Sequence, residues 1–263
     1  MLTYHEIPVA DLHLAACLHR PDHGTRNSQS PIVVCCHGLT GTRVGTAYRM
    51  VRLARMLEAV GIACLRFDFR GCGESDGCFE DLTTATLQED LRAVIAHLAT
   101  LDGCDPSRIG IFASSFGAYT ASHVSPEIPG LRCLAFLAPV SSAKALIEQD
   151  MTPEAWKFLK QHGWIEHHGL KLGRGFFERH AGENASAALA RARCPTLMFH
   201  GIRDRQVPIA HSRAYEAALQ AEGVDVRLET MDSDDHALRG IATSERILAE
   251  SLAWFTHFLS GDS

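Results

Sequence analysis

The sequence lacks any long run of apolar residues. The longest such stretch, residues 134–140, is far shorter than the roughly 20 residues that a helix needs to cross a bilayer. Near the N-terminus, polar residues such as His5 and Glu6 interrupt the segment that would have to be apolar in a secretory signal. We therefore expect no contact with a membrane, no secretory signal and a cytoplasmic location.

A basic tract is also missing. The formal net charge is -6, the pI is near 6.2, and the arginines are scattered along the chain. Binding to a phosphate backbone depends on clustered lysine and arginine, so nucleic acid is not an expected partner. With 46% hydrophobic and 21% charged residues, the composition is typical of a soluble globular protein.

The residues that bind metals do not occur in metal-binding patterns. The nine cysteines are an odd number and four of them lie in apolar runs, which indicates reduced thiols. Cys72 and Cys78 do not have the spacing of a zinc knuckle. His162, His167 and His168 have no carboxylate or thiolate beside them and are expected to face solvent. The sequence thus predicts no metal site.

What the sequence does contain is an alternation of short apolar segments with longer segments of helical period. This pattern predicts an α/β fold with a mostly parallel sheet covered by helices on both faces. The predicted buried strands are residues 32–37, 62–69, 108–113, 133–138, 196–200 and 226–231, preceded by an edge hairpin of residues 3–9 and 12–18. The predicted helices are residues 46–60, 87–101, 209–221 and 243–259.

Residues 141–191 interrupt this alternation. Connections in α/β units are short, so we expect a cap inserted into a core made of residues 1–140 and 192–263. Within the cap, Thr152 and Pro153 predict the start of a helix that Gly163 ends, and residues 164–172 predict a hairpin. The bulky aromatic residues there fit a small cap core or a substrate pocket equally well: Trp156, Trp164, Phe176 and Phe177.

The strongest motif follows the predicted strand 108–113. In Ala113-Ser114-Ser115-Phe116-Gly117, a strand turns sharply into a helix, and a serine at that turn needs small residues two positions away on each side. Ser115 has Ala113 and Gly117 there, whereas Ser114 has two phenylalanines. The pattern therefore predicts Ser115 as a nucleophile.

A second motif, residues 37–41, follows the first central strand. Acyl transfer to a serine requires two backbone N–H donors for the developing oxyanion, and Leu39 and Phe116 are placed to supply them. His37 precedes a glycine at a strand end, which favours a histidine that bonds the loop backbone over a general base. Asp68 and Arg70, in a later loop, are expected to form an ion pair with each other.

An acid and a base follow the last two predicted strands. Asp204 lies at the end of strand 196–200, and His236 lies in the loop between the last strand and the last helix. The order Ser115, Asp204, His236 suits a histidine base that a carboxylate orients. Asp232 and Asp234 remain alternatives for the acid, while Asp235 is adjacent to His236 and should point away from its ring.

Taken together, these motifs resemble the alpha/beta-hydrolase superfamily, and its cinnamoyl and feruloyl esterase branch in particular. Ala113 departs from the glycine that many members carry. The resemblance implies a serine carboxylesterase that forms an acyl-enzyme, needs no cofactor and acts on a small-molecule ester. A serine peptidase or a thioesterase of the same fold, or a non-catalytic ligand-binding relative, are the alternatives. Nothing in the sequence indicates an oligomeric state.

Overall fold

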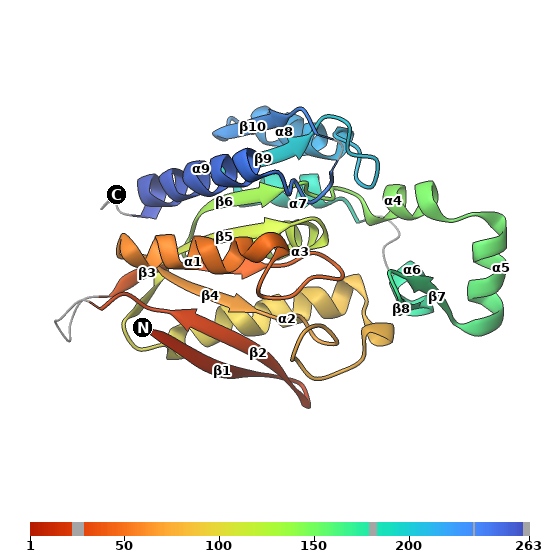
Figure 1. Ribbon diagram of the computed structural model, residues 1–263, viewed down its shortest axis with the longest axis horizontal. Coiled ribbons are helices and arrows are strands. Elements are labelled where there is room, and N and C mark those ends of the chain that lie inside the picture. The colour runs from red at the N-terminus through yellow and green to blue at the C-terminus, as the bar shows by residue number, and fades with distance from the viewer. Residues whose placement is uncertain (23–28, 179–182, 234, 260–263) are drawn as a thin grey trace.

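A twisted, mostly parallel sheet forms the centre of the computed structural model, which describes residues 1–22, 29–178, 183–233 and 235–259 (Figure 1). Its strands lie in the order β1-β2-β4-β3-β5-β6-β9-β10. The edge strands β1 and β2 pair antiparallel, β2 joins β4 antiparallel, and the remaining pairs are parallel. The strands are β1 (Leu2–Val9), β2 (Leu12–His19), β3 (Ser30–Cys36), β4 (Ala63–Phe67), β5 (Cys104–Ser114), β6 (Leu131–Leu137), β9 (Thr196–Gly201) and β10 (Val226–Met231). The predicted fold class and edge hairpin are confirmed.

Both faces of this sheet are buried because successive side chains of each strand point to opposite sides. In β3, for example, Val33 packs in one apolar cluster and Val34 in the other. Helices α1 (Arg49–Ala59) and α9 (Ile241–Leu259) cover the first face (Figure 1). The opposite face is covered by α2 (Thr84–His97), α3 (Phe116–Val124), α7 (Ala185–Ala192) and α8 (Ala210–Ala221).

The helix starts follow local capping chemistry. The Thr83 side chain accepts a hydrogen bond from the Thr86 N–H at 3.0 Å, so α2 begins earlier than its apolar period indicates. Helix α1 begins later than predicted, at Arg49, because Ala47 and Tyr48 have φ values of 52° and 56° and cannot continue a right-handed helix. Single 3₁₀ turns complete the core at Thr46–Tyr48, Phe79–Asp81, Leu98–Thr100 and Ser125–Glu127.

Beyond the carboxyl ends of the parallel strands lies a separate group of short elements (Figure 1). They are α4 (Ala143–Asp150), α5 (Pro153–His162), β7 (Trp164–His167), β8 (Leu170–Gly173) and α6 (Arg174–Glu178), and we call residues 143–178 the cap segment. The predicted helix caps at Thr152 and Gly163 and the predicted hairpin are present. Helix α7, within the range expected to form the insertion, packs instead on α3 and α8 beside the sheet.

Two buried charges have partners other than those predicted. Asp68 forms an ion pair with Arg43 and accepts a hydrogen bond from the Glu74 N–H at 3.0 Å. Arg70 donates from Nε to Asp90 at 2.6 Å. The predicted pair of Asp68 with Arg70 is wrong, because each side chain turns to a different neighbouring element. No helix in the described ranges is long and apolar enough to span a membrane.

Candidate active site

Ser115 occupies the sharp turn between β5 and α3. Its backbone has φ 52° and ψ -121°, a strained conformation for a residue with a side chain. The turn brings Gly117 so close to β3 that an added Cβ would lie 2.4 Å from the His37 carbonyl oxygen. Ala113, on the other side, is fully buried. The small residues that flank Ser115 in the sequence are therefore a requirement of this turn.

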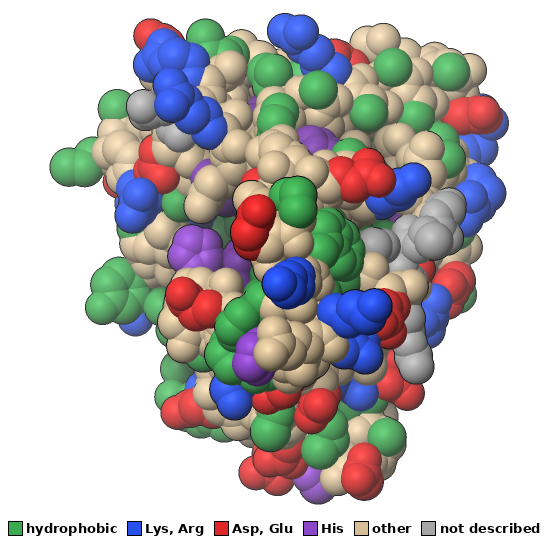
Figure 2. Space-filling view, turned by 90° about the vertical axis from the view of Figure 1, so that its right-hand side faces the viewer, with side chains coloured by type: hydrophobic (Ala, Val, Ile, Leu, Met, Phe, Trp, Pro, Cys, Tyr) green, Lys and Arg blue, Asp and Glu red, His purple; other side chains and the backbone are tan. Residues whose placement is uncertain are grey.

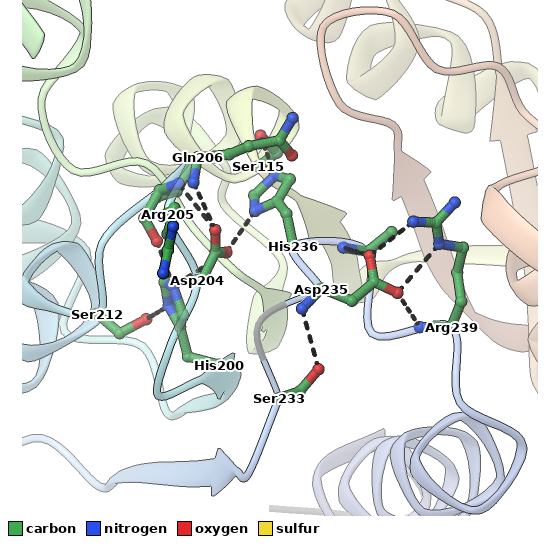
Figure 3. Close-up of polar contacts among 12 residues, drawn as sticks. Ser115, His200, Asp204, Arg205, Gln206, Ser212, Ser233, Asp235, His236 and Arg239 are labelled. Carbon is green, nitrogen blue, oxygen red and sulfur yellow. Dashed lines mark hydrogen bonds and ion pairs between the residues drawn. The ribbon is translucent and has the colours of Figure 1, made fainter. Parts of the chain in front are cut away.

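His236 lies within hydrogen-bond distance of both Ser115 and Asp204 (Figure 3). Its Nε2 is 3.1 Å from Ser115 Oγ, and its Nδ1 is 2.6 Å from Asp204 Oδ2. An ionised carboxylate only accepts, so Nδ1 carries the proton and Nε2 accepts from the serine hydroxyl. The structure thus brings together the three side chains that the sequence indicated, in an arrangement that can remove a proton from Ser115.

The Asp204 carboxylate is buried and held from several directions. Its Oδ1 accepts from the Gln206 and Val207 N–H groups at 2.9 and 3.0 Å, and His200 Nε2 lies 3.5 Å from Oδ2. Burial alone would raise the pKa of Asp204, but hydrogen bonds from the two imidazoles hold that pKa well below its usual range. The carboxylate therefore stays ionised at any pH at which His236 would need it.

The two alternative acids that the structure describes have other partners. Asp235 accepts from the Arg239 backbone N–H at 2.8 Å and from its guanidinium, so its carboxylate points away from His236 (Figure 3). Asp232 pairs with Arg203 and is largely exposed. Asp234 lies outside the described residues. Of the three acids that the structure describes, Asp204 is the one in contact with the His236 ring.

The two expected oxyanion donors lie on either side of Ser115. Phe116 is the first residue of α3, so its N–H has no partner within the helix. The loop of Leu39 runs against the turn, since a Cβ on Gly38 would lie 3.2 Å from Ser115 Cβ. His37 holds this loop in place: its Nδ1 donates to the Gly38 carbonyl at 2.7 Å and its Nε2 accepts from the Phe69 N–H at 3.0 Å. Both ring nitrogens thus form hydrogen bonds with backbone groups, as predicted for a histidine that bonds the loop backbone.

A strained serine, a buried acid and a histidine follow one another in this order along a chain that forms an α/β sheet. The sequence profile of the prolyl oligopeptidase family matches residues 48–262. The chain belongs to this family. Its fold is that of the alpha/beta-hydrolase superfamily, as the motifs predicted.

The relatives of this member of the prolyl oligopeptidase family are named for different activities. Quorum-quenching protein AidA of Acinetobacter baumannii (strain MDR-ZJ06) is 40% identical over 108 residues, which cover 41% of this chain and 34% of that protein. The acylamino-acid-releasing enzyme of Arabidopsis thaliana is 22% identical over 233 residues, covering 87% of this chain and 30% of that protein. The match therefore spans about a third of each relative's length.

Among solved structures, Est1E of Butyrivibrio proteoclasticus with ferulic acid bound superimposes with a TM-score of 0.81. It shares 20% sequence identity, and the superposition covers 98% of this chain and 100% of Est1E. At this level of identity, the likeness establishes the fold.

A pocket of about 500 Å³ opens beside Ser115 in this family member. Core residues such as Met50, Leu137 and Val207 give part of its wall an apolar surface, and polar side chains line the rest. The cap segment contributes Leu146, Asp150, His167 and His168. On the face that Figure 2 shows, acidic and basic side chains of the described residues are intermixed.

The cap aromatics considered for this pocket do not line it. Phe176 and Phe177 are buried, and Phe176 packs edge-on against Phe116 with ring centroids 5.2 Å apart. Trp156 is 42% exposed and packs on Phe177, while Lys171 lies over the Trp164 ring. These four side chains hold the cap segment together and fasten it to the core. The expectation that they bind substrate is not supported.

The sequence did not predict which cap residues line the pocket, because the residue types at these positions form no recognised motif. His167 and His168 were expected to face solvent, and the hairpin turn brings both to the pocket, with His168 still exposed. Burial and the neighbouring His168 lower the pKa of His167. Within the described residues, no three or more His, Cys, Asp or Glu side chains cluster in a way that could hold a metal ion.

Proposed function

We propose that this protein hydrolyses carboxylic esters through a covalent acyl-enzyme on Ser115. The observation that carries the proposal is the unbroken contact from Asp204 through His236 to Ser115, at the floor of an open pocket. In the proposed reaction, Ser115 Oγ attacks the ester carbonyl while His236 Nε2 takes its proton. The oxyanion is stabilised by the N–H groups of Leu39 and Phe116.

The second half of the reaction uses the same groups. Collapse of the tetrahedral adduct breaks the ester bond, and His236 returns the proton to the leaving alkoxide, which departs as an alcohol. Water, deprotonated by His236, then attacks the acyl-enzyme. The tetrahedral adduct collapses, His236 returns the proton to Ser115 Oγ, and the acid product leaves. Asp204 stabilises the positive charge that His236 carries in both steps.

The apolar part of the pocket wall favours a short-to-medium or aromatic acyl group. Met50, Leu137 and Leu146 offer aliphatic surface to such a group. The structural likeness to Est1E, which was solved with ferulic acid, supports an aromatic acid as one candidate. Peptide or thioester hydrolysis by the same residues is the second candidate, supported by the family match and by a relative named for releasing acylamino acids.

Covalent labelling tests the reaction class. A fluorophosphonate probe should label Ser115, and tandem mass spectrometry should find the adduct on that residue; Ser115→Ala should abolish labelling, while Ser114→Ala retains it. An adduct on Ser114, or no adduct, would refute the proposed nucleophile.

A substrate panel then separates the candidate activities. We expect 4-nitrophenyl butyrate and methyl ferulate to be hydrolysed faster than an acyl-coenzyme A thioester or N-acetylalanine 4-nitroanilide. If the anilide or the thioester has the higher kcat/KM, the ester assignment is replaced by the corresponding alternative.

A further inference from the structure

Arg49 is a buried cation in the wall of the active-site pocket. It is the first residue of α1, it is 2% exposed, and it lines the pocket together with Met50 and Ala237. Its Nη2 donates to the Leu238 carbonyl oxygen at 2.7 Å. The guanidinium therefore lies between α1 and the loop that carries His236.

This guanidinium is short of acceptors. A guanidinium has five N–H donors, yet in the described part of the chain Leu238 O is its one acceptor, and Nε is buried without a partner. No carboxylate of a described residue forms an ion pair with it. Burial lowers the pKa of Arg49 to about 10, against the opposing effect of Asp235, so the side chain still carries its charge at neutral pH.

Arg239, the second arginine that lines the pocket, differs from Arg49 in both exposure and pairing. Arg239 is well exposed, and its guanidinium contacts both Asp235 oxygens at 3.0 Å. Its charge is thus already paired and open to solvent. Asp150, on the cap side of the pocket, is exposed and forms no hydrogen bond or ion pair with Arg49. Arg49 is consequently the cation of this pocket that is both buried and without an ion-pair partner among the described residues.

An unpaired buried charge is costly, and an anion that enters the pocket would remove that cost. We propose that Arg49 binds a carboxylate carried by the substrate, so that the preferred esters of this enzyme are anionic. The inference rests on the proposed esterase function and specifies its substrate class. A planar guanidinium suits a carboxylate because two parallel N–H groups can bond its two oxygens.

Matched ester pairs test this inference on both sides of the scissile bond. On the acyl side, mono-4-nitrophenyl glutarate is compared with the neutral isostere 4-nitrophenyl 5-methylhexanoate. On the alcohol side, 4-acetoxybenzoate is compared with 4-isopropylphenyl acetate. We expect wild-type kcat/KM to be higher for the carboxylate member of at least one pair, and the preference to fall as NaCl is added. The pair that shows it identifies the side on which Arg49 acts.

Substitution then assigns the preference to this residue. Arg49→Met should lower kcat/KM for the preferred carboxylate ester by about tenfold or more, mainly through KM, and leave its neutral isostere within a few-fold. Arg52→Met is the matched control, since Arg52 lies one turn along α1, is half-exposed and pairs with Glu245. It should change neither member of the pair.

Two results would overturn the inference. If wild-type enzyme prefers the neutral member of both pairs, no variant is needed to reject it. If Arg49→Met lowers kcat/KM for both members equally, Arg49 acts as a positioning residue for the loop of His236 through Leu238.

The proposed function fails separately, when no ester of the panel is hydrolysed. In that case glutarate should still raise the Tm of the wild type and not of Arg49→Met, and an equal shift in both would reject the carboxylate site as well.

Discussion

His236 Nδ1 lies 2.6 Å from Asp204 Oδ2, although 32 residues separate the two in the sequence. The neighbour of His236 in sequence, Asp235, is turned toward Arg239 instead (Figure 3). The carboxyl ends of β9 and β10 are adjacent, so the loops that follow them place the acid beside the base. The acid that assists His236 is therefore set by strand pairing.

Asp204→Asn should lower kcat for the best ester by about 10⁴-fold, because an amide at this position no longer stabilises the charged imidazole or selects its tautomer. Asp232→Asn is the control. Asp232 is exposed and pairs with Arg203, so its replacement should change kcat less than threefold. Steady-state kinetics of the two purified variants at neutral pH measure both effects. A larger loss at Asp232 would move the acid to that residue.

The sequence predicted the features of the site that depend on strand order and on steric limits. Ser115 could be chosen over Ser114 because a strained turn tolerates only small flanking residues, and Gly117 indeed lies against the β3 backbone. Asp204 and His236 each follow a predicted strand, and adjacent parallel strands bring such loops together. The boundaries of β10 matched the prediction because its apolar period ends where the loop begins.

Features that depend on how loops dock could not be predicted. Asp68 and Arg70 are close in sequence, but their partners come from a distant loop and from α2. The late start of α1 depends on two left-handed residues of types that rarely adopt that conformation. In the cap segment, the large aromatic side chains fitted a cap core or a substrate pocket equally well. Their direction is set by the packing of the hairpin on the core, which no local pattern encodes.

The low pKa of Asp204 predicts a specific dependence of stability on pH. A carboxyl whose pKa is depressed in the folded state binds protons more readily when unfolded. Its stabilising contribution is therefore present above about pH 5 and is lost as the pH falls below about 4 toward the folded-state pKa. Asparagine does not titrate, so the free energy of unfolding of wild type minus that of Asp204→Asn should shrink across this range. Urea unfolding of both proteins at pH 7 and pH 3 measures the change, and a constant difference would contradict the assigned shift.

Gly117→Ala should disrupt the turn at Ser115. The new Cβ would lie 2.4 Å from His37 O and 2.5 Å from Cys36 O, both of them backbone atoms of a central strand region. We expect a loss of about 1–3 kcal/mol in stability and a loss of fluorophosphonate labelling, because the backbone must move where Ser115 is held. Gly240→Ala is the control, since its Cβ would make ordinary contact with Thr243 at 3.4 Å. A normally stable and reactive Gly117→Ala protein would show that the turn is less constrained than the structure indicates.

The cap segment contains residues that line the pocket and residues that pack within the cap. Leu146 lines the pocket, whereas Trp156 packs on Phe177 away from it. Leu146 is half-buried, so truncation to alanine should remove roughly 1 kcal/mol of apolar contact with an acyl chain that reaches the cap. That corresponds to about a fivefold fall in kcat/KM for 4-nitrophenyl octanoate relative to the acetate.

Trp156→Ala should leave this ratio unchanged and lower the Tm by a few degrees, because its contacts are within the cap. The acetate serves as the internal control, since an acetyl group is too short to need the cap. If Trp156→Ala changed the octanoate-to-acetate ratio and Leu146→Ala did not, substrate would have to contact the cap aromatics in a conformation other than the one described. The ratio of the two esters thus distinguishes a wall of the pocket from the packing that supports it.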